Sequence, residues 1–178
     1  LITAGTGFVG RELPERLKLR FPAARVVVAG PEPSAAEGAQ VARFDLLDPV
    51  SIRDLIAAVR PTALIQLAGV THVPEAQASG ERVWRANVLG VAQLAEAVLE
   101  LAPECRFLNV SSGEVYGVTG NNRAKLVEDD PLRPANLYAV TKCAAELALQ
   151  EAALRGLRLV VARPFNHTGP TQETRFVV

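Results

Sequence analysis

Tyr138 and Lys142 stand four positions apart in the segment Tyr138-Ala-Val-Thr-Lys142. Positions i and i+4 share one face of a helix, so the phenol and the ammonium would lie side by side. A tyrosine ordinarily titrates near pKa ~10, but a positive charge about 4 Å away is worth roughly 4 kcal/mol, on the order of three pK units. The pair therefore predicts a tyrosine that exchanges a proton with a substrate hydroxyl or carbonyl. A surface pair on an amphipathic helix is the alternative.

Gly5, Gly7 and Gly10 form a Gly-x-Gly-x-x-Gly turn between an expected strand at 1–3 and an expected helix at 11–20. Glycines at this spacing let the backbone turn tightly and approach a pyrophosphate, whose charge faces the helix N-terminus. The turn therefore predicts a dinucleotide site. A glycine-rich turn without a ligand is the alternative.

Short apolar runs alternate with helical stretches along the chain. The pattern predicts strands at 1–3, 25–29, 40–45, 63–68, 106–111 and 157–162, and helices at 11–20, 50–59, 81–101 and 136–155. Continuously apolar strands separated by helices indicate a parallel sheet that is buried on both faces, and right-handed crossovers make it doubly wound. The predicted fold class is α/β, a doubly wound parallel sheet of the Rossmann type, in which ligands bind beyond the carboxyl ends of the strands.

The composition is that of an ordinary globular domain, with 178 residues, 49% of them apolar, 21% charged and no net charge. This length allows one domain with a core of its own. No basic block indicates binding to nucleic acid, and no apolar run is long enough to span a membrane. Cys105 and Cys143 fit neither a metal-ligand spacing nor a disulfide framework. We therefore expect no metal, and a reducing, cytoplasmic compartment.

The residue after the second strand normally selects the cofactor, because an acid there binds the ribose 2′-hydroxyl of NAD and an arginine accepts the 2′-phosphate of NADP. Here Gly30 and Pro31 come first and Glu32 follows, with no arginine beside it. The choice between NAD and NADP therefore stays open at this point. Asp45, after the third strand, would either receive the adenine amino group or cap the following turn.

Further motifs follow in one order along the chain: Thr3-Ala-Gly-Thr-Gly-Phe-Val-Gly10, Asp45-Leu46, Leu67-Ala68-Gly69, Asn87, Ser111-Ser-Gly-Glu-Val-Tyr-Gly117, Tyr138-Ala-Val-Thr-Lys142 and Arg163-Pro-Phe-Asn166. In order and spacing they resemble the extended short-chain dehydrogenases/reductases of the nucleotide-sugar epimerase/dehydratase family. The resemblance covers essentially the whole chain. One position departs from it, because Ala4 stands where the family usually places its first glycine.

The resemblance implies that the catalytic residues are Ser112, Tyr138, Lys142 and Glu114. Tyr138 would donate and accept the proton, while Lys142 would hold the nicotinamide ribose and lower the pKa of Tyr138. Ser112 would bind the reacting sugar oxygen. In related 4,6-dehydratases a glutamate at the place of Glu114 removes the C5 proton, whereas in a reductase it would bind substrate hydroxyls. The substrate-binding residues implied are Ser112, Gly113, Glu114, Tyr138 and Asn166.

The resemblance also implies NADP or NAD as the cofactor and a nucleotide-diphosphate sugar as the substrate. The residues that it assigns to the cofactor are Gly5, Gly7, Phe8, Val9, Gly10, Asp45, Leu46, Leu67, Ala68, Gly69, Asn87, Tyr138, Lys142 and Pro164. Members of the family often form homodimers through two helices per subunit, here the helix around Asn87 and the helix of Tyr138. Residues 1–178 would form the NAD(P)-binding domain, and a C-terminal substrate domain is expected beyond residue 178.

Within the family, the segment from Arg163 to Gln172 resembles GDP-4-keto-6-deoxy-D-mannose reductases, with Thr171 in place of an expected glycine. The predicted reaction is the NAD(P)H-dependent reduction of a 4-keto nucleotide sugar, GDP-4-keto-6-deoxy-mannose to GDP-rhamnose. Two alternatives stay open: a 4-epimerase or 4,6-dehydratase with tightly bound NAD, and a non-catalytic NAD(P)-sensing module. Gly113 stands where some dehydratases have a second acid. His72 and His167 are more often structural in such settings, and Tyr116 would lie near the nicotinamide or in the core.

Overall fold

The computed structural model describes residues 1–32, 39–70, 79–122 and 125–169 of the chain. In these residues six parallel strands form one sheet in the order β3-β2-β1-β4-β5-β6. The strands are β1 (Ile2–Thr3), β2 (Val27–Gly30), β3 (Gln40–Arg43), β4 (Ala63–Gln66), β5 (Arg106–Val110) and β6 (Arg158–Ala162). The chain winds outwards from β1 in both directions, which confirms the predicted doubly wound Rossmann fold.

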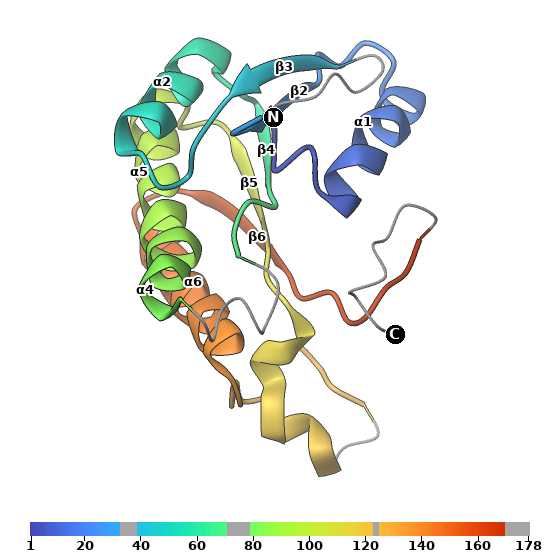
Figure 1. The fold of residues 1–178 in the computed structure, drawn as a ribbon, viewed down its shortest axis with the longest axis vertical. Helices are drawn as coiled ribbons and strands as arrows, with labels where there is room; N and C mark the ends of the chain where they lie inside the picture. The colour runs from blue at the N-terminus through green and yellow to red at the C-terminus, as the bar shows by residue number, and fades with distance from the viewer. Residues whose placement is uncertain (33–38, 71–78, 123–124, 170–178) are drawn as a thin grey trace.

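Helices cover both faces of the sheet (Figure 1). One face carries α2 (Pro49–Val59), α5 (Val91–Leu101) and α6 (Leu137–Leu154), and the other carries α1 (Phe8–Arg20). The larger core fills the three-helix side, where the bulkiest buried side chains are Phe44, Ile52, Ile56, Leu64, Leu94, Phe107 and Leu149. A smaller cluster on the α1 side contains Ile2 and Val28, with Leu13 and Leu17 packed against it.

The two edge strands are less buried than the sequence pattern predicts. All four residues of β2 are buried, whereas β3 is exposed at three of its four positions and β6 has no fully buried residue. An edge strand has a neighbour on one side only, so fewer side chains pack against it. The expectation that every strand is buried on both faces is therefore wrong for β3 and β6.

The expected helix at 81–101 is divided into three parts. It contains α4 (Gly80–Trp84), the π-helical turn η1 (Arg85–Gly90) and α5. A second unpredicted element is the 3₁₀ segment η2 (Gly113–Asn122), which kinks at Gly117. Gly117 has a φ of 45°, and a Cβ there would lie 2.1 Å from the carbonyl oxygen of Arg133, so only glycine fits.

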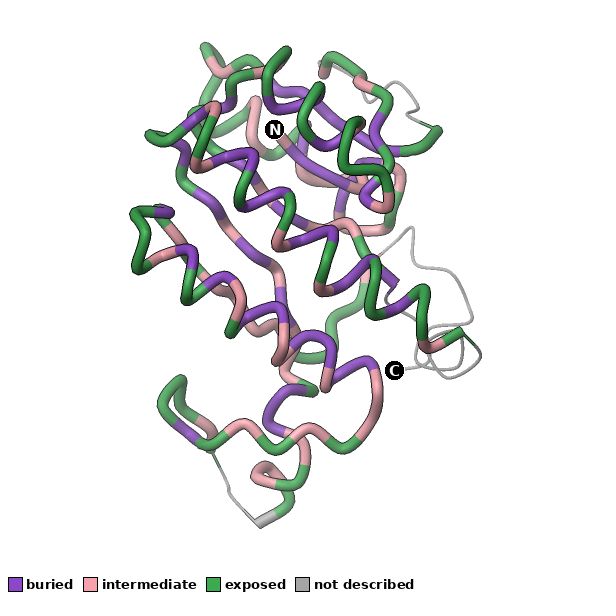
Figure 2. The backbone as a smooth tube through the Cα atoms, turned by 90° about the vertical axis from the view of Figure 1, so that its left-hand side faces the viewer, coloured by how far each residue is buried: buried purple, intermediate pink, exposed green. Residues whose placement is uncertain are grey.

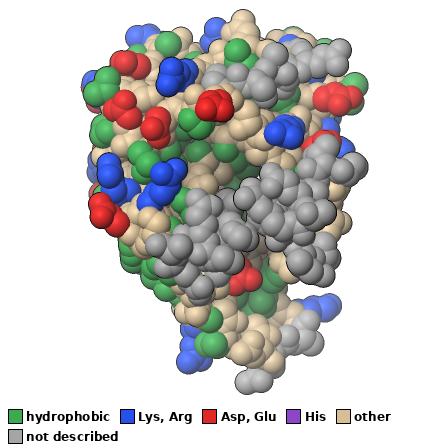
Figure 3. All heavy atoms as spheres, viewed as in Figure 1, with side chains coloured by type: hydrophobic (Ala, Val, Ile, Leu, Met, Phe, Trp, Pro, Cys, Tyr) green, Lys and Arg blue, Asp and Glu red, His purple; other side chains and the backbone are tan. Residues whose placement is uncertain are grey.

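Burial along the backbone follows this layered arrangement. Figure 2 shows long buried runs in the strands and an alternation of buried and exposed residues along the helices. On the face seen in Figure 3, acidic and basic side chains are interspersed, and neither sign gathers into one patch. Among the residues that the structure describes, no helix has the length and apolar character of a membrane span, and no group of three or more His, Cys, Asp or Glu is placed to hold a metal ion.

Candidate active site

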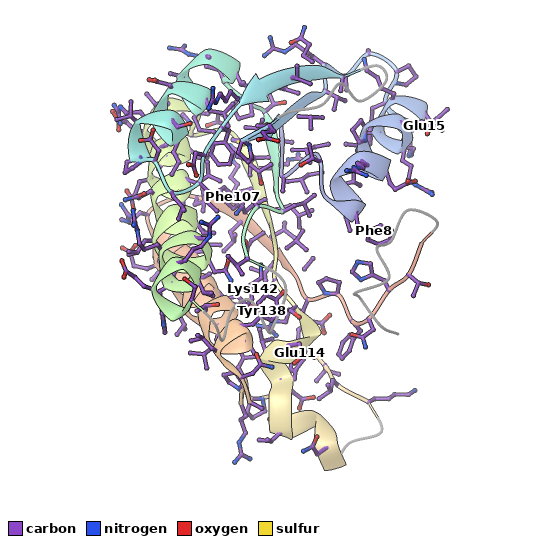
Figure 4. The ribbon with its side chains drawn as sticks, in the orientation of Figure 1. Phe8, Glu15, Phe107, Glu114, Tyr138 and Lys142 are labelled. Carbon is purple, nitrogen blue, oxygen red and sulfur yellow. The ribbon has the colours of Figure 1, made fainter. Side chains whose placement is uncertain are left out.

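The starting point of α6 determines where the tyrosine and the lysine lie. The side chain of Asn136 accepts a 2.8 Å hydrogen bond from the backbone N–H of Ala139, and this N-cap starts the helix at Leu137. Tyr138 therefore lies in the first turn, and Lys142 lies one turn later on the same face. Both side chains are buried, with residue exposures of 8% and 7%. Figure 4 shows them close together on α6, with Glu114 nearby on η2.

Lys142 is held between α6 and the sheet. Its Nζ donates a 2.9 Å hydrogen bond to the carbonyl oxygen of Val110, the last residue of β5, and lies 5.9 Å from the centre of the Tyr138 ring. Burial disfavours the charged form and lowers the pKa of Lys142 to about 8, and the charge of Glu146 acts in the opposite direction. The lysine is therefore about half protonated near pH 8 and loses its charge as the pH rises above that value.

The pKa of Tyr138 is shifted in the direction opposite to the one expected from the sequence. Burial raises it, the negative charge of Glu114 adds to the rise, and a hydrogen bond with Ser112 lowers it. The ammonium of Lys142 is turned to the carbonyl of Val110 and does not overcome the effect of burial. Tyr138 is therefore held in its protonated form at neutral pH, and this is the form that can donate a proton to a substrate.

Ser112 and Glu114 come from the segment that follows β5. The Oγ of Ser112 accepts a 3.2 Å hydrogen bond from the backbone N–H of Glu114, which turns the chain into η2. The carboxylate of Glu114 in turn accepts a 3.1 Å hydrogen bond from the side-chain amide of Asn136. The N-cap of α6 thus holds Glu114 beside Tyr138, and the structure brings the predicted catalytic residues Ser112, Glu114, Tyr138 and Lys142 together.

Gly113 joins this group to the end of β6. Its backbone N–H donates a 2.8 Å hydrogen bond to the carbonyl oxygen of Pro164, and a Cβ at Gly113 would lie 2.9 Å from the ring of Phe165. A larger residue at 113 would push the segment after β6 away from the site. Asn166, which the sequence assigns to the substrate, is exposed on that segment.

The glycine turn lies at the end of β1 and leads into α1. Gly5 and Gly10 have no room for a side chain, because a Cβ at Gly5 would lie 1.5 Å from Cγ1 of Val28 and one at Gly10 would lie 2.2 Å from the carbonyl oxygen of Ala4. Ala4 has a φ of 55°, a left-handed conformation that favours glycine. The one position that departs from the family pattern therefore has a backbone conformation that favours glycine.

This turn fits a dinucleotide. Gly7 is the N-cap of α1 and makes no side-chain cap, and the first turn of the helix contains no acidic residue. The backbone N–H groups of a helix N-terminus bind an anion such as a pyrophosphate, and the side-chain-free Gly5, Gly7 and Gly10 allow its close approach. Phe8 and Val9 form the first residues of that helix.

Thr3 fixes the neighbouring wall of the site. Its buried hydroxyl accepts hydrogen bonds from the backbone N–H groups of Leu67, at 2.9 Å, and Ala68, at 3.0 Å, and donates to the side chain of Gln66. The residues after β4 are therefore locked to the end of β1. This brings the predicted cofactor residues Leu67, Ala68 and Gly69 next to the glycine turn.

Asn87 is the clamp of the segment after β4. Its Oδ1 accepts a 2.8 Å hydrogen bond from Val70 N–H, and its Nδ2 donates to the Val70 carbonyl at 3.0 Å and to Thr141 Oγ1 at 3.1 Å. Both amide hydrogens are used within the protein. The clamp holds that segment against α6, while the predicted contact of Asn87 with the cofactor stays a prediction.

Asp45 and Leu46 follow β3. Asp45 Oδ1 accepts a 2.9 Å hydrogen bond from Leu47 N–H, so its carboxylate caps a turn, one of the two roles expected from the sequence. Leu46 is buried against Gly90, where a Cβ would lie 2.4 Å from the Leu46 carbonyl oxygen. Contact of either residue with adenine stays a prediction.

The start of α1 and the segment after β6 are in contact through two aromatic rings. Phe8, on the first turn of α1, stacks on His167 with ring centres 6.0 Å apart and ring planes at 17° (Figure 4 labels Phe8). His167 Nδ1 also lies 3.0 Å from the Phe165 carbonyl oxygen, so His167 has a structural setting. His72, Thr171 and Gln172 lie outside the described residues.

The sequence model of the NAD dependent epimerase/dehydratase family matches residues 1–178, which is the whole chain. The chain belongs to this family. Its parallel sheet is therefore that of a family in which structural neighbours bind NADPH or NAD.

Similar family members carry out several reactions on nucleotide sugars. The GDP-6-deoxy-D-mannose reductase of Pseudomonas aeruginosa is 44% identical over 137 residues, which are 76% of this chain and 45% of that protein. The dTDP-glucose 4,6-dehydratase of Mycolicibacterium smegmatis is 32% identical over 184 residues, which are 97% of this chain and 54% of that protein. The chain thus spans about half the length of the curated relatives that it matches.

The similar solved structures likewise include enzymes of more than one kind. The structure of RMD from Pseudomonas aeruginosa, complexed with NADPH, has a TM-score of 0.75 and 37% identity, over 98% of this chain and 56% of that one. UDP-glucose 4-epimerase from Brucella ovis, in complex with NAD, has a TM-score of 0.83 and 28% identity, over 93% of this chain and 51% of that one.

Sequence reasoning missed Glu146 and its pairing with Arg163, which it had named only as the start of a motif. Glu146 is 1% exposed and forms an ion pair with Arg163, with a shortest nitrogen–oxygen distance of 2.8 Å. A signal was present in the sequence, because Glu146 follows Lys142 by four positions in an otherwise apolar stretch of helix. A carboxylate on the buried face of a helix needs a cationic partner.

Proposed function

We propose that this chain contains the cofactor-binding and catalytic residues of an NAD(P)H-dependent reductase of a 4-keto nucleotide sugar. The observation that carries the proposal is the meeting of Ser112, just after β5, with Tyr138 and Lys142 on one buried face of α6, where Lys142 binds the carbonyl of Val110. The substrate class is supported by the 44% identity to a GDP-6-deoxy-D-mannose reductase. GDP-4-keto-6-deoxy-mannose, reduced to GDP-rhamnose, is the substrate that we propose.

Reduction of a ketone needs a proton donor at the oxygen that becomes an alkoxide. Tyr138 suits this role because burial raises its pKa and keeps it protonated. Ser112 would donate a second hydrogen bond to the same oxygen, and preformed donors of this kind stabilise the developing charge. Lys142 would hold its charge near the departing proton of Tyr138 and so favour the phenolate that is left.

The nicotinamide cofactor, when bound, supplies the hydride. The N-terminus of α1 and the glycine turn would hold its diphosphate, and Phe8, Val9 and Pro164 would line the same site. The contacts of Leu46, Gly69 and Asp45 with its adenosine half are part of this proposal.

Glu114 favours a second candidate. Its carboxylate is held beside Tyr138 by Asn136, where it could remove a proton from a sugar carbon, as a 4,6-dehydratase requires. A 4,6-dehydratase is also among the relatives, at 32% identity. The two candidates differ in cofactor use, because a dehydratase or epimerase returns the hydride to the sugar and a reductase consumes one reduced cofactor per turnover.

The deciding experiment is a turnover assay on purified protein with GDP-4-keto-6-deoxy-mannose and added NADPH or NADH. We expect one reduced cofactor to be oxidised for each sugar reduced. Turnover that needs no added cofactor, with NAD retained through purification, would refute the reductase and favour the dehydratase or epimerase. Parallel assays with GDP-mannose and dTDP-glucose then identify the substrate of that reaction.

A homodimer is part of the proposal. Trp84 on α4, Leu89 on η1 and Leu147 on α6 are large apolar side chains that are exposed on the two helices expected to form the dimer. Sedimentation measurements of the protein and of a Leu89→Glu, Leu147→Glu variant test it. A monomeric parent protein would contradict the dimer.

A further inference from the structure

Glu146 is a buried charge that the proposed reaction does not use directly. Its carboxylate accepts hydrogen bonds from Arg163 at 2.8 Å (Nη2) and 3.2 Å (Nε), and another from the hydroxyl of Ser111. A buried carboxylate normally has such partners, because an unpaired charge in the protein interior is costly. The arrangement is therefore a built site for a negative charge, one helical turn below Lys142.

The same carboxylate faces the catalytic lysine. Glu146 follows Lys142 by one turn of α6, and its charge favours the ammonium form of that side chain against the effect of burial. Tyr138, the third residue on this face, is in turn influenced by Ser112 and Glu114. The charge of Glu146 favours the protonated form of Lys142 and so opposes the effect of burial.

Glu146 also fixes the end of β5. Ser111, which it binds, stands between Val110, whose carbonyl accepts the Lys142 hydrogen bond, and Ser112, whose hydroxyl meets Tyr138. The backbone N–H of Ser111 donates to the Ala162 carbonyl oxygen at 2.8 Å, so the same point is joined to β6. A movement of Ser111 would displace both contacts of the catalytic pair.

Arg163 completes the group from the other side. Its Nη1 donates to the Tyr116 hydroxyl at 2.9 Å and to the Glu128 carbonyl oxygen at 2.8 Å, and its guanidinium lies 5.2 Å from the Tyr116 ring centre. Pairing with Glu146 raises the pKa of Arg163, so it is charged throughout. Cys143 is a further titratable group near Glu146, and its thiol pKa is raised by burial and by the charge of Glu146.

We propose that Glu146 is a positioning residue of this site: its carboxylate holds Lys142 in the charged form and fixes the strand end that carries Ser112. Arg163 pairs with the carboxylate of Glu146 and so weakens the effect of that negative charge on Lys142. The role in turnover rests on the proposed function, whereas the effect on the charge of Lys142 does not. Removing either member of the ion pair must therefore displace the Lys142 titration in opposite directions.

The test follows the protonation of Lys142 by NMR in protein with isotope-labelled lysine side chains. The chain has three lysines, and a Lys142→Met sample identifies the signal. We expect Glu146→Gln to lower the titration midpoint by about one pH unit and Arg163→Gln to raise it by a similar amount. Glu151→Gln is the matched control, since Glu151 lies on the same helix in an exposed pair with Arg155, and it should leave the midpoint unchanged.

An unchanged midpoint in Glu146→Gln, or displacements of the same sign in both variants, would overturn the proposal. If Glu146→Gln does not fold, Arg163→Gln decides alone, because an upward displacement supports the proposal and none refutes it. The alkaline limb of the turnover rate should move with each midpoint. A titration that moves as expected in a protein without reductase turnover would refute the proposed function and leave the role of Glu146 standing.

Discussion

The Nζ of Lys142 donates a 2.9 Å hydrogen bond to the carbonyl oxygen of Val110. Lys142 lies on α6 and Val110 ends β5, so this bond ties the helix to the strand end from which Ser112 projects. Ser112 and Tyr138 lie on the two sides of the same junction, and Ser112 lowers the pKa of Tyr138. The bond made by the lysine therefore helps to hold the proton donor against this strand end.

Removing the phenolic hydroxyl tests the proton donor. We expect Tyr138→Phe to lower kcat by about 10²–10⁴-fold, because general acid catalysis contributes roughly that much, while the Kd for the cofactor changes little. Steady-state turnover and fluorescence titration with NADPH measure the two quantities. A Tyr138→Phe variant with unchanged turnover would contradict the assignment and favour a non-catalytic module. Lys18→Met, in the last turn of α1, is a control distant from the site.

The rate should fall at alkaline pH. The pKa of Lys142 is lowered by burial to about 8, so its proton is lost as the pH rises through that value. If the charged lysine is needed, kcat/KM decreases above about pH 8, whereas loss of the Tyr138 proton, whose pKa is raised, comes later. A pH profile of kcat/KM shows this limb. A rate that stays level well beyond pH 8 would mean that Lys142 acts without its charge.

Lys142 should also limit the stability of the fold. Its folded-state pKa, about 8, is below the ordinary value of 10.5, so the charge destabilises the folded form at neutral pH and stability rises as the pH increases through this interval. We expect Lys142→Met to unfold at a higher urea concentration, with a gain of about 1 kcal/mol, and to lose turnover. A variant that is both inactive and less stable would show that the bond to Val110 outweighs the burial of the charge.

Ala4 is expected to be a poor residue for its conformation. Its φ of 55° is unfavourable for an L-residue by about 1–2 kcal/mol, and glycine there would lose part of the gain to chain entropy. We predict that Ala4→Gly stabilises the protein by about 0.5–1 kcal/mol and keeps or improves cofactor affinity. Ala57→Gly, at an exposed position in the last turn of α2, is the matched control and should destabilise by up to about 1 kcal/mol. Urea unfolding measures both, and equal signs would refute the argument.

The cofactor choice can be tested at the ends of β2 and β3. Arg43 pairs in register with Gly30, the last residue of β2, and its side chain is exposed there, whereas Glu32 follows two positions after Gly30. An arginine at this place binds the 2′-phosphate of NADP. We expect Arg43→Gln to raise KM for NADPH about tenfold and to leave KM for NADH unchanged, with Arg16→Gln as control. A Glu32→Gln variant that loses NADH instead would indicate an NAD enzyme.

The sheet and the clustering of the candidate site residues were predictable because they depend on local patterns. Apolar runs alternating with helices predict a doubly wound parallel sheet, and the spacing of Tyr138 and Lys142 places them on one face of α6. The exposure of the edge strand β3 was not predictable from the sequence. It depends on the absence of a further neighbouring strand, and the residues Gln40–Arg43 carry no signal of that.

The electrostatics of the site were predicted with the wrong sign for Tyr138. The expectation counted the charge of Lys142 but not the burial of the phenol or the nearby Glu114. Both depend on how η2 and α6 pack, which spacing along the chain does not reveal. The ion pair of Glu146 and Arg163 was not predictable for the same reason, because it joins residues 17 positions apart through the packing of α6 against the end of β6.

The π-helical turn between Arg85 and Gly90 has one residue more than an α-helix needs to cover the same rise. Deleting one residue there would let the turn close as a regular helix and leave α4 and α5 in nearly the same relation, because the wider turn absorbs the extra residue locally. Asn87, which clamps Val70 and Thr141, would then point elsewhere, although the helix itself would be more regular. The number of residues in this turn is therefore as much a requirement of the site as their identity.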